Sequence, residues 1–434
     1  MYRKAIDELK KWKDSGTRKP LIIRGARQVG KTWLMKRFGE ECYKQYAYIN
    51  FDNNERMENL FKGDLNIDRL ITALQIESGV TIDVSNTLII FDEVQEVPRA
   101  LTSLKYFYEN APQYHIVCAG SLLGVALHPG TSFPVGKVDF TDLYPLNFTE
   151  FMMATGNENL AELLTKQDFG LITSFKGRYI DLLKQYYYVG GMPEAVASFI
   201  GKQDYSEVRE IQKKLLSAYE QDFSKHAPNE TVPRIRMLWN SVPSQLAKEN
   251  RKFIYGLIRE GARAKEYELA MTWLLDCGLI YKVGRVSKPD MPLAAYQDMS
   301  AFKLFILDVG LLSALTSLDI KSILEGNKIF EEFKGSLTEQ YILQQLVATK
   351  EVTPYYWSTD KGTAEIDFIF QSESEIVPLE VKAAENLQAK SLKSYCAKYN
   401  PKYAIRTSMS DYRKEEWLTN LPLYAINVIG EIVK

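Results

Sequence analysis

The sequence predicts an α/β protein whose first part is a doubly wound parallel sheet, and three observations support this fold class. Short apolar runs alternate with segments in which apolar residues recur at helical spacing. The runs at 21–24, 45–51, 87–93 and 115–121 have the composition of buried parallel strands. Polar residues stand at or directly after the ends of the last three runs, as expected where ligands bind at the carboxyl edge of such a sheet. This alternation is typical of βαβ units.

The elements of this first part can be assigned in order along the chain. The start of the sequence, at 1–12, is a charged amphipathic helix without the apolar core of a signal peptide. Helical periodicity follows at 33–38, 66–75 and 98–109, between the four strands. A further strand is expected at 137–140.

A glycine-rich turn follows the first strand. Its spacing is G-x-x-x-x-G-K-T, from Gly25 to Thr32, and a helical segment continues from it. The glycines let successive N–H groups point at a phosphate, and the helix N-terminus adds partial positive charge. In this strand–loop–helix context the motif predicts a nucleotide-binding loop. The residues expected to contact ATP are Gly25, Ala26, Arg27, Gln28, Val29, Gly30, Lys31, Thr32 and Trp33.

The side chains around this loop suggest ATP hydrolysis with Mg²⁺ as cofactor. Lys31 is expected to reach the β- and γ-phosphates, and the Thr32 hydroxyl is expected to ligate Mg²⁺. Asp92 ends an apolar run, where it could hold Mg²⁺ directly or through water, and Glu93 is placed to polarise the attacking water. Ser121 could sense the γ-phosphate, or it could simply begin a loop.

The loop, the Asp92–Glu93 pair and Ser121 together resemble the AAA-type branch of the P-loop ATPases. The resemblance implies that a basic residue from a neighbouring subunit completes the site, and therefore a homo-oligomer. The sequence does not choose among the candidates, each of which is otherwise a solvated surface charge. These candidates are Arg27, Arg99, Lys137 and Arg263.

Composition limits the possible functions. The chain has 434 residues, 46% of them hydrophobic and 25% charged, which suits two to four globular domains. The formal net charge of −1 excludes general attraction to nucleic acid or membrane. Four widely spaced cysteines without a C-x-x-C pair favour a cytoplasmic protein without metal or disulfide sites at cysteine. No run approaches 18 apolar residues, so no membrane span is expected.

Pattern changes along the chain divide it into four expected domains: an ATPase domain at 1–155, a helical extension at 156–228, a winged-helix domain at 229–330 and a last α/β domain at 331–434. The third assignment rests on the order helix, turn, helix, β-hairpin. Residues 201–265 hold thirteen lysines and arginines against eight acids. Winged helices often read DNA, but they also serve as packing or lid domains.

The last domain carries a second group of candidate catalytic residues. Asp367 lies in a predicted strand at 364–370, and Glu380 and Lys382 lie in another at 376–382. Period 2 places Glu380 and Lys382 on one face, and a hairpin at 372–375 would bring Asp367 near Glu380. The acids could bind Mg²⁺, and Lys382 could activate water against a phosphodiester. The alternative is a salt-bridged sheet face without catalysis.

The spacing D-x(n)-E-x-K resembles the restriction-endonuclease-like nucleases. Glu339, on the preceding predicted helix, resembles the acid that such folds add to the metal site. Taken with other motifs, the chain resembles prokaryotic AAA-like ATPases that end in a domain of unknown function. The resemblance implies an ATPase core, a winged helix and a restriction-endonuclease-like end. The motifs are those at 24–32, 190–194, 243–247, 302–310 and 379–382.

Two functional hypotheses therefore remain. One is an ATPase that acts on DNA or RNA and carries nuclease capability. The other is a signalling or remodelling ATPase that acts on protein partners, in which the nuclease-like domain only makes contacts. They differ in whether nucleic acid stimulates ATP hydrolysis with a salt-sensitive effect.

Overall fold

The structure is a computed structural model that describes residues 1–84, 86–120, 134–248, 252–326, 330–359, 364–383 and 389–434. These residues form two compact units. The amino-terminal unit comprises Tyr2–Tyr144 with Asp276–Gly278. The carboxy-terminal unit comprises Pro145–Leu275 and Leu279–Lys434, together with Met1.

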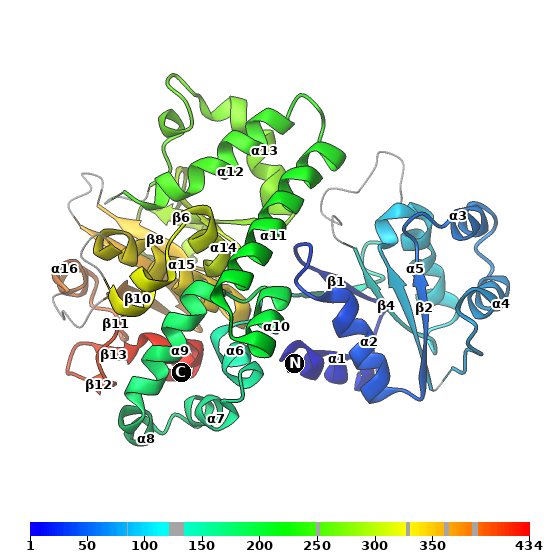
Figure 1. Cartoon of the computed structure of the whole chain (residues 1–434), viewed down its shortest axis with the longest axis horizontal. Helices are drawn as coiled ribbons and strands as arrows, with labels where there is room; N and C mark the ends of the chain where they lie inside the picture. Colours follow the sequence, from blue (N-terminus) through cyan, green and yellow to red (C-terminus); the bar gives the residue numbers. More distant parts are fainter. Residues whose placement is uncertain (85, 121–133, 249–251, 327–329, 360–363, 384–388) are drawn as a thin grey trace. The chain divides into compact units, whose positions relative to one another are not determined.

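A five-stranded parallel sheet, counted over the described residues, forms the centre of the amino-terminal unit (Figure 1). Its order is β2-β3-β4-β1-β5, and every pair of neighbours is parallel. The predicted parallel α/β sheet is thus confirmed for the first part of the chain. The strands are β1 Leu21–Arg24, β2 Gln45–Asn50, β3 Thr87–Asp92, β4 His115–Ala119 and β5 Asp139–Asp142.

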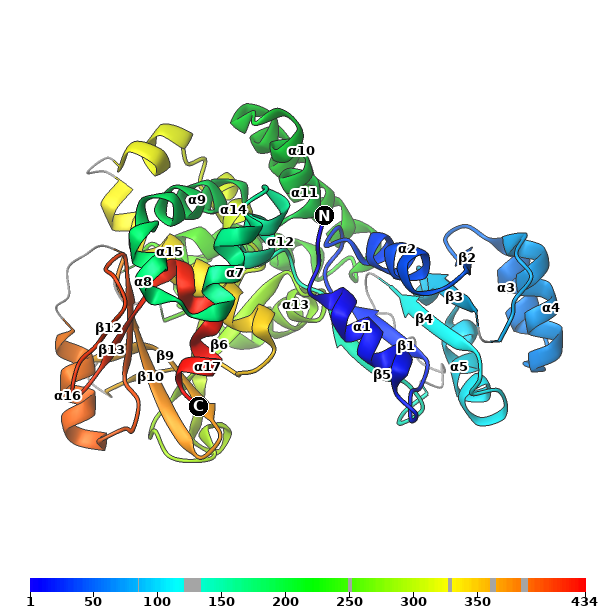
Figure 2. The same ribbon diagram turned by 90° about the horizontal axis from the view of Figure 1, so that it is seen from below.

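Helices cover both faces of this sheet, with α2 and α5 on opposite sides (Figure 2). Along β3, Ile89 and Phe91 join a buried cluster on the α5 side, whereas Leu88 and Ile90 are equally buried but lie outside that cluster. A strand buried on both faces explains the unbroken apolar run in its sequence. The helices are α1 Ala5–Asp14, α2 Lys31–Cys42, α3 Glu55–Lys62, α4 Ile67–Ser78 and α5 Pro98–Asn110.

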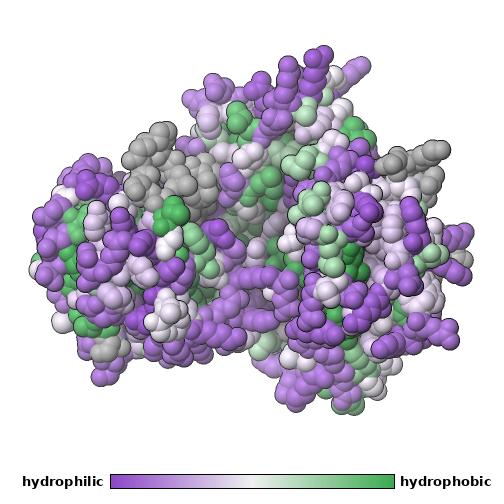
Figure 3. All heavy atoms as spheres, turned by 180° about the vertical axis from the view of Figure 1, so that it is seen from behind, coloured by the Kyte–Doolittle hydropathy of each residue, from purple (hydrophilic) through white to green (hydrophobic). Residues whose placement is uncertain are grey.

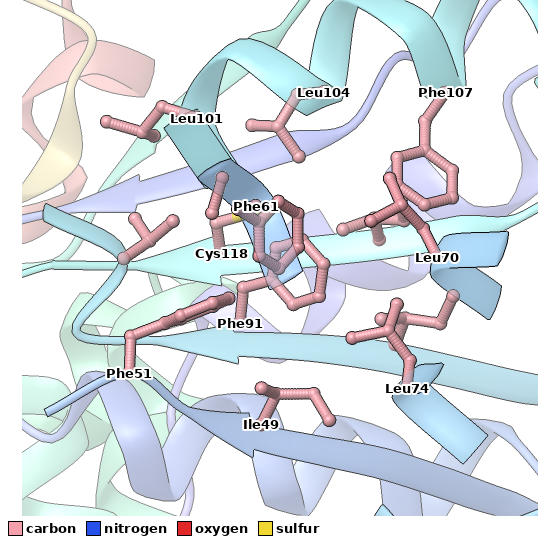
Figure 4. Packing of buried hydrophobic residues seen from close by; sticks show 14 of the residues in the cluster. Ile49, Phe51, Phe61, Leu70, Leu74, Phe91, Leu101, Leu104, Phe107 and Cys118 are labelled. Carbon is pink, nitrogen blue, oxygen red and sulfur yellow. The ribbon is translucent and has the colours of Figure 1, made fainter. Parts of the chain in front are cut away.

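Three phenylalanines from different elements meet in the cluster on the α5 side (Figure 4). Phe51 follows β2, Phe61 lies on α3 and Phe91 lies on β3. Their ring centroids are 5.2 to 6.1 Å apart in edge-to-face geometry. Such pairs contribute about 1 kcal/mol each beyond the burial of apolar area. This packing fixes β2 beside β3, the strand that carries Asp92 and Glu93.

The carboxy-terminal unit combines helices with a mixed sheet. In the described residues this sheet has eight strands in the order β12-β13-β11-β10-β9-β8-β6-β7. Figure 2 shows β9 and β10 lying together in it. The strands are β6 Ile280–Val286, β7 Gln297–Ile306, β8 Tyr355–Ser358, β9 Glu365–Ser372, β10 Glu375–Val381, β11 Ile405–Ser408, β12 Arg413–Lys414 and β13 Thr419–Pro422.

Most helices of this unit come before its strands in the sequence, and the others lie between or after the strands. They are α6 Phe148–Ala154, α7 Glu158–Lys166, α8 Phe169–Ser174, α9 Lys176–Val189, α10 Pro193–Lys202, α11 Tyr205–His226, α12 Val232–Leu246, α13 Ala264–Asp276, α14 Val309–Leu315, α15 Phe330–Thr349, α16 Lys390–Tyr399 and α17 Ile429–Ile432. The segment from α12 to β7 has the order helix, helix, antiparallel strand pair. Strand β6 of this segment also pairs with β8. The β6–β7 pair therefore belongs to the same sheet as β9 and β10. The winged-helix and nuclease-like assignments stay predictions, as do the domain boundaries.

A buried carboxylate joins the motifs at 190–194 and 302–310. Asp308 accepts hydrogen bonds from the backbone N–H of Gly191 at 2.6 Å and of Leu311 at 3.0 Å, and from the Gln344 amide at 3.0 Å. A Cβ atom at Gly190 would overlap the Asp308 carboxylate. Burial raises the pKa of Asp308, against the effect of these donors. Both motifs are therefore explained by packing within this unit.

The surface carries no dominant apolar patch on the face that Figure 3 shows, where hydrophilic residues predominate among the coloured atoms. Across the described residues, no helix has the length and apolar character needed to cross a membrane.

His115 gives the amino-terminal unit a specific pH dependence. Burial, with the nearby charges of Arg18 and Lys13, lowers the pKa of His115 to about 4. The unfolded chain takes up this proton near pH 6.5 but the folded protein does not, so stability should fall as the pH drops from about 6.5 to 4. Thermal unfolding of His115→Gln should show a smaller loss across this range than the wild type.

The matched control is His226→Gln, which replaces a histidine of α11 in the other unit. If both variants lose stability with falling pH as steeply as the wild type, His115 does not contribute the dependence.

Candidate functional site

The glycine loop between β1 and α2 is held in a conformation that two glycines permit. Gly25 has a φ of 144° and Gly30 a φ of 94°, both in the region that side chains rarely adopt. A Cβ atom at Gly25 would overlap the carbonyl oxygen of Leu143. The buried Arg3 guanidinium donates to the carbonyl of Val29 at 3.1 Å and so braces the loop from outside.

Lys31 is folded back onto the loop. Its ammonium donates to the carbonyl oxygens of Gly25 at 2.9 Å and Ala26 at 2.7 Å. The residue is only 7% exposed, and burial lowers the pKa of Lys31 to about 8, although Glu93 and Asp92 act to raise it. A partly desolvated ammonium that contacts two neutral carbonyls would be strongly stabilised by the negative charge of a phosphate. Lys31 is therefore well prepared to hold an anion.

The Asp92 carboxylate connects the loop helix to the sheet. The Thr32 hydroxyl donates to Asp92 Oδ2 at 2.7 Å, and the Tyr48 hydroxyl donates to the same oxygen at 2.8 Å. The backbone N–H of Glu93 donates to Oδ1 at 3.1 Å. Asp92 is 4% exposed. A hydroxyl and a carboxylate in contact supply the oxygen ligands that Mg²⁺ prefers, so these residues fit the predicted cofactor.

Glu93 lies beside Asp92 in a left-handed conformation with a φ of 51°. Its carboxylate accepts a hydrogen bond from the side-chain amide of Gln95 at 2.6 Å. Gln95 and Tyr48 were not predicted from the sequence, because neither belongs to a linear motif. The predicted Ser121 lies outside the described residues.

The remaining loop residues differ in exposure. Arg27 is partly exposed, Gln28 and Trp33 are exposed, and Gln28 has a φ of 65°. Among the other basic candidates, Arg99 donates to the carbonyl of Gly63 at 3.0 Å, and Lys137 pairs with Glu109 at 3.0 Å. These contacts give both a role within their own unit.

The second group of candidate residues comes together in the carboxy-terminal unit. Strands β9 and β10 form the expected antiparallel hairpin, whose last pair, Phe368 with Leu379, comes directly before Asp367 on one strand and Glu380 on the other. The backbone N–H of Val381 donates to Asp367 at 2.7 Å. The Lys382 ammonium pairs with Glu380 at 2.7 Å, and Glu380 is 5% exposed. Asp367, Glu380 and Lys382 thus converge.

A further lysine enters this group from β7. The Lys303 side chain is 0% exposed, and its ammonium lies 2.6 Å from Glu365, 3.7 Å from Glu339 and 4.9 Å from the centre of the Tyr356 ring. We call these acids and lysines the carboxylate cluster: Lys303, Glu339, Glu365, Asp367, Glu380 and Lys382. A lysine amid the apolar residues of 302–307 is the sequence signal that could have identified it.

The acids raise one another's proton affinity. Burial, and then the charges of Glu339 and Glu380, raise the pKa of Asp367. Burial raises the pKa of Glu380, against the effect of Lys382. Although burial acts to lower it, the partner Glu380 raises the pKa of Lys382. The cluster therefore favours an additional positive charge.

The expected three-acid metal site is not assembled in this structure. No group of three or more His, Cys, Asp or Glu side chains within the described ranges is arranged to hold a metal ion. Glu339, predicted as a metal ligand, lies 3.7 Å from the Lys303 ammonium, and, besides burial, its charge also raises the pKa of Asp367 and of Glu380. A buried carboxylate needs a nearby positive charge, and here the chain supplies one. Asp367 and Glu380 remain as a pair.

The parallel sheet and the glycine loop give the amino-terminal unit the fold of P-loop ATPases. Residues 17–152 match a family model described as AAA domain, so this fold is AAA-like. Residues 180–322 match a model described as domain of unknown function DUF8612, and residues 334–426 match domain of unknown function DUF4143. No curated protein matches the chain.

Three solved structures that resemble the chain are the following. The Walker-type ATPase of Pyrococcus abyssi is 15% identical, with 71% of this chain and 95% of that chain covered and a TM-score of 0.44. The Orc1 protein of Aeropyrum pernix, solved in complex with DNA, is 12% identical over 73% and 91%, with a TM-score of 0.26. Cdc6p of Pyrobaculum aerophilum is 13% identical over 74% and 94%, with a TM-score of 0.25.

Lys303→Met should destabilise the carboxy-terminal unit strongly. The variant leaves Glu365 and the buried Glu339 without their ammonium partner, and breaking such a buried pair costs about 3 kcal/mol. Denaturant unfolding followed by circular dichroism would measure the shift in midpoint.

Lys282→Met is the matched control, because Lys282 lies on the adjacent strand β6 and contacts the Phe302 ring rather than an acid. It should cost about 1 kcal/mol or less. Equal losses in the two variants would contradict the role assigned to Lys303.

Proposed function

We propose that the amino-terminal unit binds ATP with Mg²⁺ and hydrolyses it. The observation that carries this proposal is the 2.7 Å hydrogen bond from Thr32 to Asp92, which joins the glycine loop to the end of β3 beside the buried Lys31. The loop N–H groups and Lys31 would bind the phosphates. Thr32 and Asp92 would hold Mg²⁺, which neutralises phosphate charge when bound.

Glu93 would act on the attacking water. As the water oxygen forms its bond to the γ-phosphorus, the bond from that phosphorus to the bridging oxygen breaks, and ADP leaves. Glu93 accepts the proton that the water loses and later returns it to solvent. In the structure its carboxylate is held by Gln95 at 2.6 Å, so the base has a defined resting partner.

Two variants test the ATPase proposal. Lys31→Ala removes the phosphate-binding ammonium and should abolish binding of a fluorescent ATP analogue. Glu93→Gln removes the base but keeps its size, so nucleotide should still bind while turnover falls by a factor of about 100 or more. Binding by fluorescence and phosphate release would be measured for both.

Lys44→Ala is a suitable control, because Lys44 is exposed just before β2. It should behave like the wild type. Normal ATP affinity in Lys31→Ala would show that nucleotide binds elsewhere and would overturn the assignment.

We also propose a second candidate function, divalent-metal-dependent cleavage of a phosphodiester in DNA or RNA. It is supported by the convergence of Asp367, Glu380 and Lys382 on the β9–β10 hairpin. Asp367 and Glu380 would supply the oxygen ligands, and Lys382 would orient the water. In this scheme Lys303 balances part of the acidic charge within the protein. The segment from α12 to β7 would provide nucleic-acid contacts as a winged helix.

Asp367→Ala should remove any Mg²⁺- or Mn²⁺-dependent cleavage of single- or double-stranded DNA and RNA. The control is Glu375→Gln, at the opposite end of β10. Cleavage that survives in Asp367→Ala comes from another site or a contaminant.

The alternative is an ATPase that acts on protein partners, with a carboxylate cluster that is only structural. Stimulation of ATP hydrolysis by nucleic acid, weakening as salt increases, would favour an ATPase that acts on DNA or RNA. Absence of stimulation at low salt, together with no cleavage, would favour action on proteins.

A further inference from the structure

Tyr48 makes a contact that the glycine-loop motif does not predict. It lies on β2, the strand next to β3, and its hydroxyl donates to Asp92 Oδ2 at 2.8 Å. The β2–β3 register aligns Asn50 with Asp92, so Tyr48 reaches the carboxylate from two residues earlier on its strand. This contact requires a long side chain with a hydrogen-bond donor at its end, which the tyrosine hydroxyl supplies.

The tyrosine ring is itself held in place from α2. The Lys36 ammonium lies 3.9 Å from the centre of the Tyr48 ring. Lys36 is one helical turn after Thr32, so both face the same side of α2. The start of α2 therefore contacts Asp92 twice, directly through Thr32 and indirectly through Lys36 and Tyr48.

The hydrogen bonds determine which oxygen of Asp92 is available. A carboxylate can accept about four hydrogen bonds, two at each oxygen. Thr32 and Tyr48 both donate to Oδ2, whereas Oδ1 accepts from the Glu93 N–H among the described residues. Asp92 has no proton to give when ionised, so the Tyr48 hydroxyl must be the donor. This arrangement restrains the rotation of the carboxylate and leaves acceptor capacity at Oδ1.

We propose that Tyr48 is a positioning residue for Mg²⁺: its hydroxyl fixes the Asp92 carboxylate in the orientation that the metal requires. The inference rests on the proposed function, because it assigns a role in the same ATP site. Side chains that orient metal-binding carboxylates typically change metal affinity by 10- to 100-fold when removed. The Tyr48 hydroxyl donates to Asp92 and not to a group expected to bind phosphate, so its effect should appear only when Mg²⁺ is present.

The test separates metal affinity from nucleotide affinity in Tyr48→Phe, which keeps the ring over Lys36 and removes only the hydroxyl. Binding of a fluorescent ATP analogue would be titrated first with a chelator and then with increasing Mg²⁺. We expect unchanged affinity without Mg²⁺ and an Mg²⁺ requirement about tenfold higher. The apparent KM for Mg²⁺ should rise similarly, while kcat at saturating Mg²⁺ stays within about twofold, because the site is restored once the metal is bound.

Tyr46→Phe is the matched control. Tyr46 lies two residues earlier on β2, on the same face, and is also partly exposed. It should retain the wild-type Mg²⁺ requirement. In an Asp92→Ala background, Tyr48→Phe should add no further loss, since the group that it orients is absent.

Several outcomes would overturn the proposal. One is a wild-type Mg²⁺ requirement in Tyr48→Phe, and another is an equal loss with and without Mg²⁺, which would indicate a structural role. If Tyr48→Phe does not fold, Lys36→Met offers a second variant that loosens the ring and should raise the Mg²⁺ requirement two- to threefold. An unchanged requirement there overturns the proposal as well. If the wild type binds no ATP, the proposed function fails and this inference with it.

Discussion

A charged side chain taken out of water must find partners inside the protein, and both candidate sites follow from this constraint. In the amino-terminal unit, Lys31 is satisfied by carbonyl oxygens of its own loop, and Asp92 by two hydroxyls. In the carboxy-terminal unit, Lys303 is satisfied by acids from a helix and another strand. The two lysines differ in the strength of their partners. Neutral carbonyls leave the Lys31 ammonium available to a phosphate, whereas carboxylates engage Lys303 fully.

Sequence reasoning could identify the parts of these sites that are local in the chain. The glycine loop and the Asp92–Glu93 pair each lie within one strand and its following turn, so spacing alone indicates their geometry. The hairpin that brings Asp367 near Glu380 is also local, because about ten residues separate the two strand centres. Tyr48 and Lys303 were missed because their partners depend on which strands become neighbours. The pairing of β2 with β3 is set by packing around Phe51, Phe61 and Phe91, which no spacing rule shows. For Glu339, the resemblance to nucleases indicated an acid at a metal site, but the sequence did not show that a lysine would lie beside it.

The motifs at 190–194 and 302–310 show the opposite case, in which a conspicuous pattern has a structural explanation. The Asp308 carboxylate accepts a hydrogen bond from the Gly191 N–H, and a side chain at Gly190 would displace this carboxylate. Buried carboxylates that accept several backbone hydrogen bonds hold distant segments in one arrangement. The same segment then contributes Lys303 to the carboxylate cluster. The stretch 302–310 thus has two roles. Asp308 supports the packing of the unit, and Lys303 neutralises acids of the carboxylate cluster.

The pairing of β6 with β8 has a mechanical consequence. Backbone hydrogen bonds connect β7 through β6, β8 and β9 to β10, with register shifts in the β6–β7 and β8–β9 pairings. Close-packed elements of this kind transmit strain instead of absorbing it. Lys303 on β7 and Glu365 on β9 are therefore held at a fixed separation by the strands between them, so the backbone of the sheet keeps the acid and its counter-charge in register.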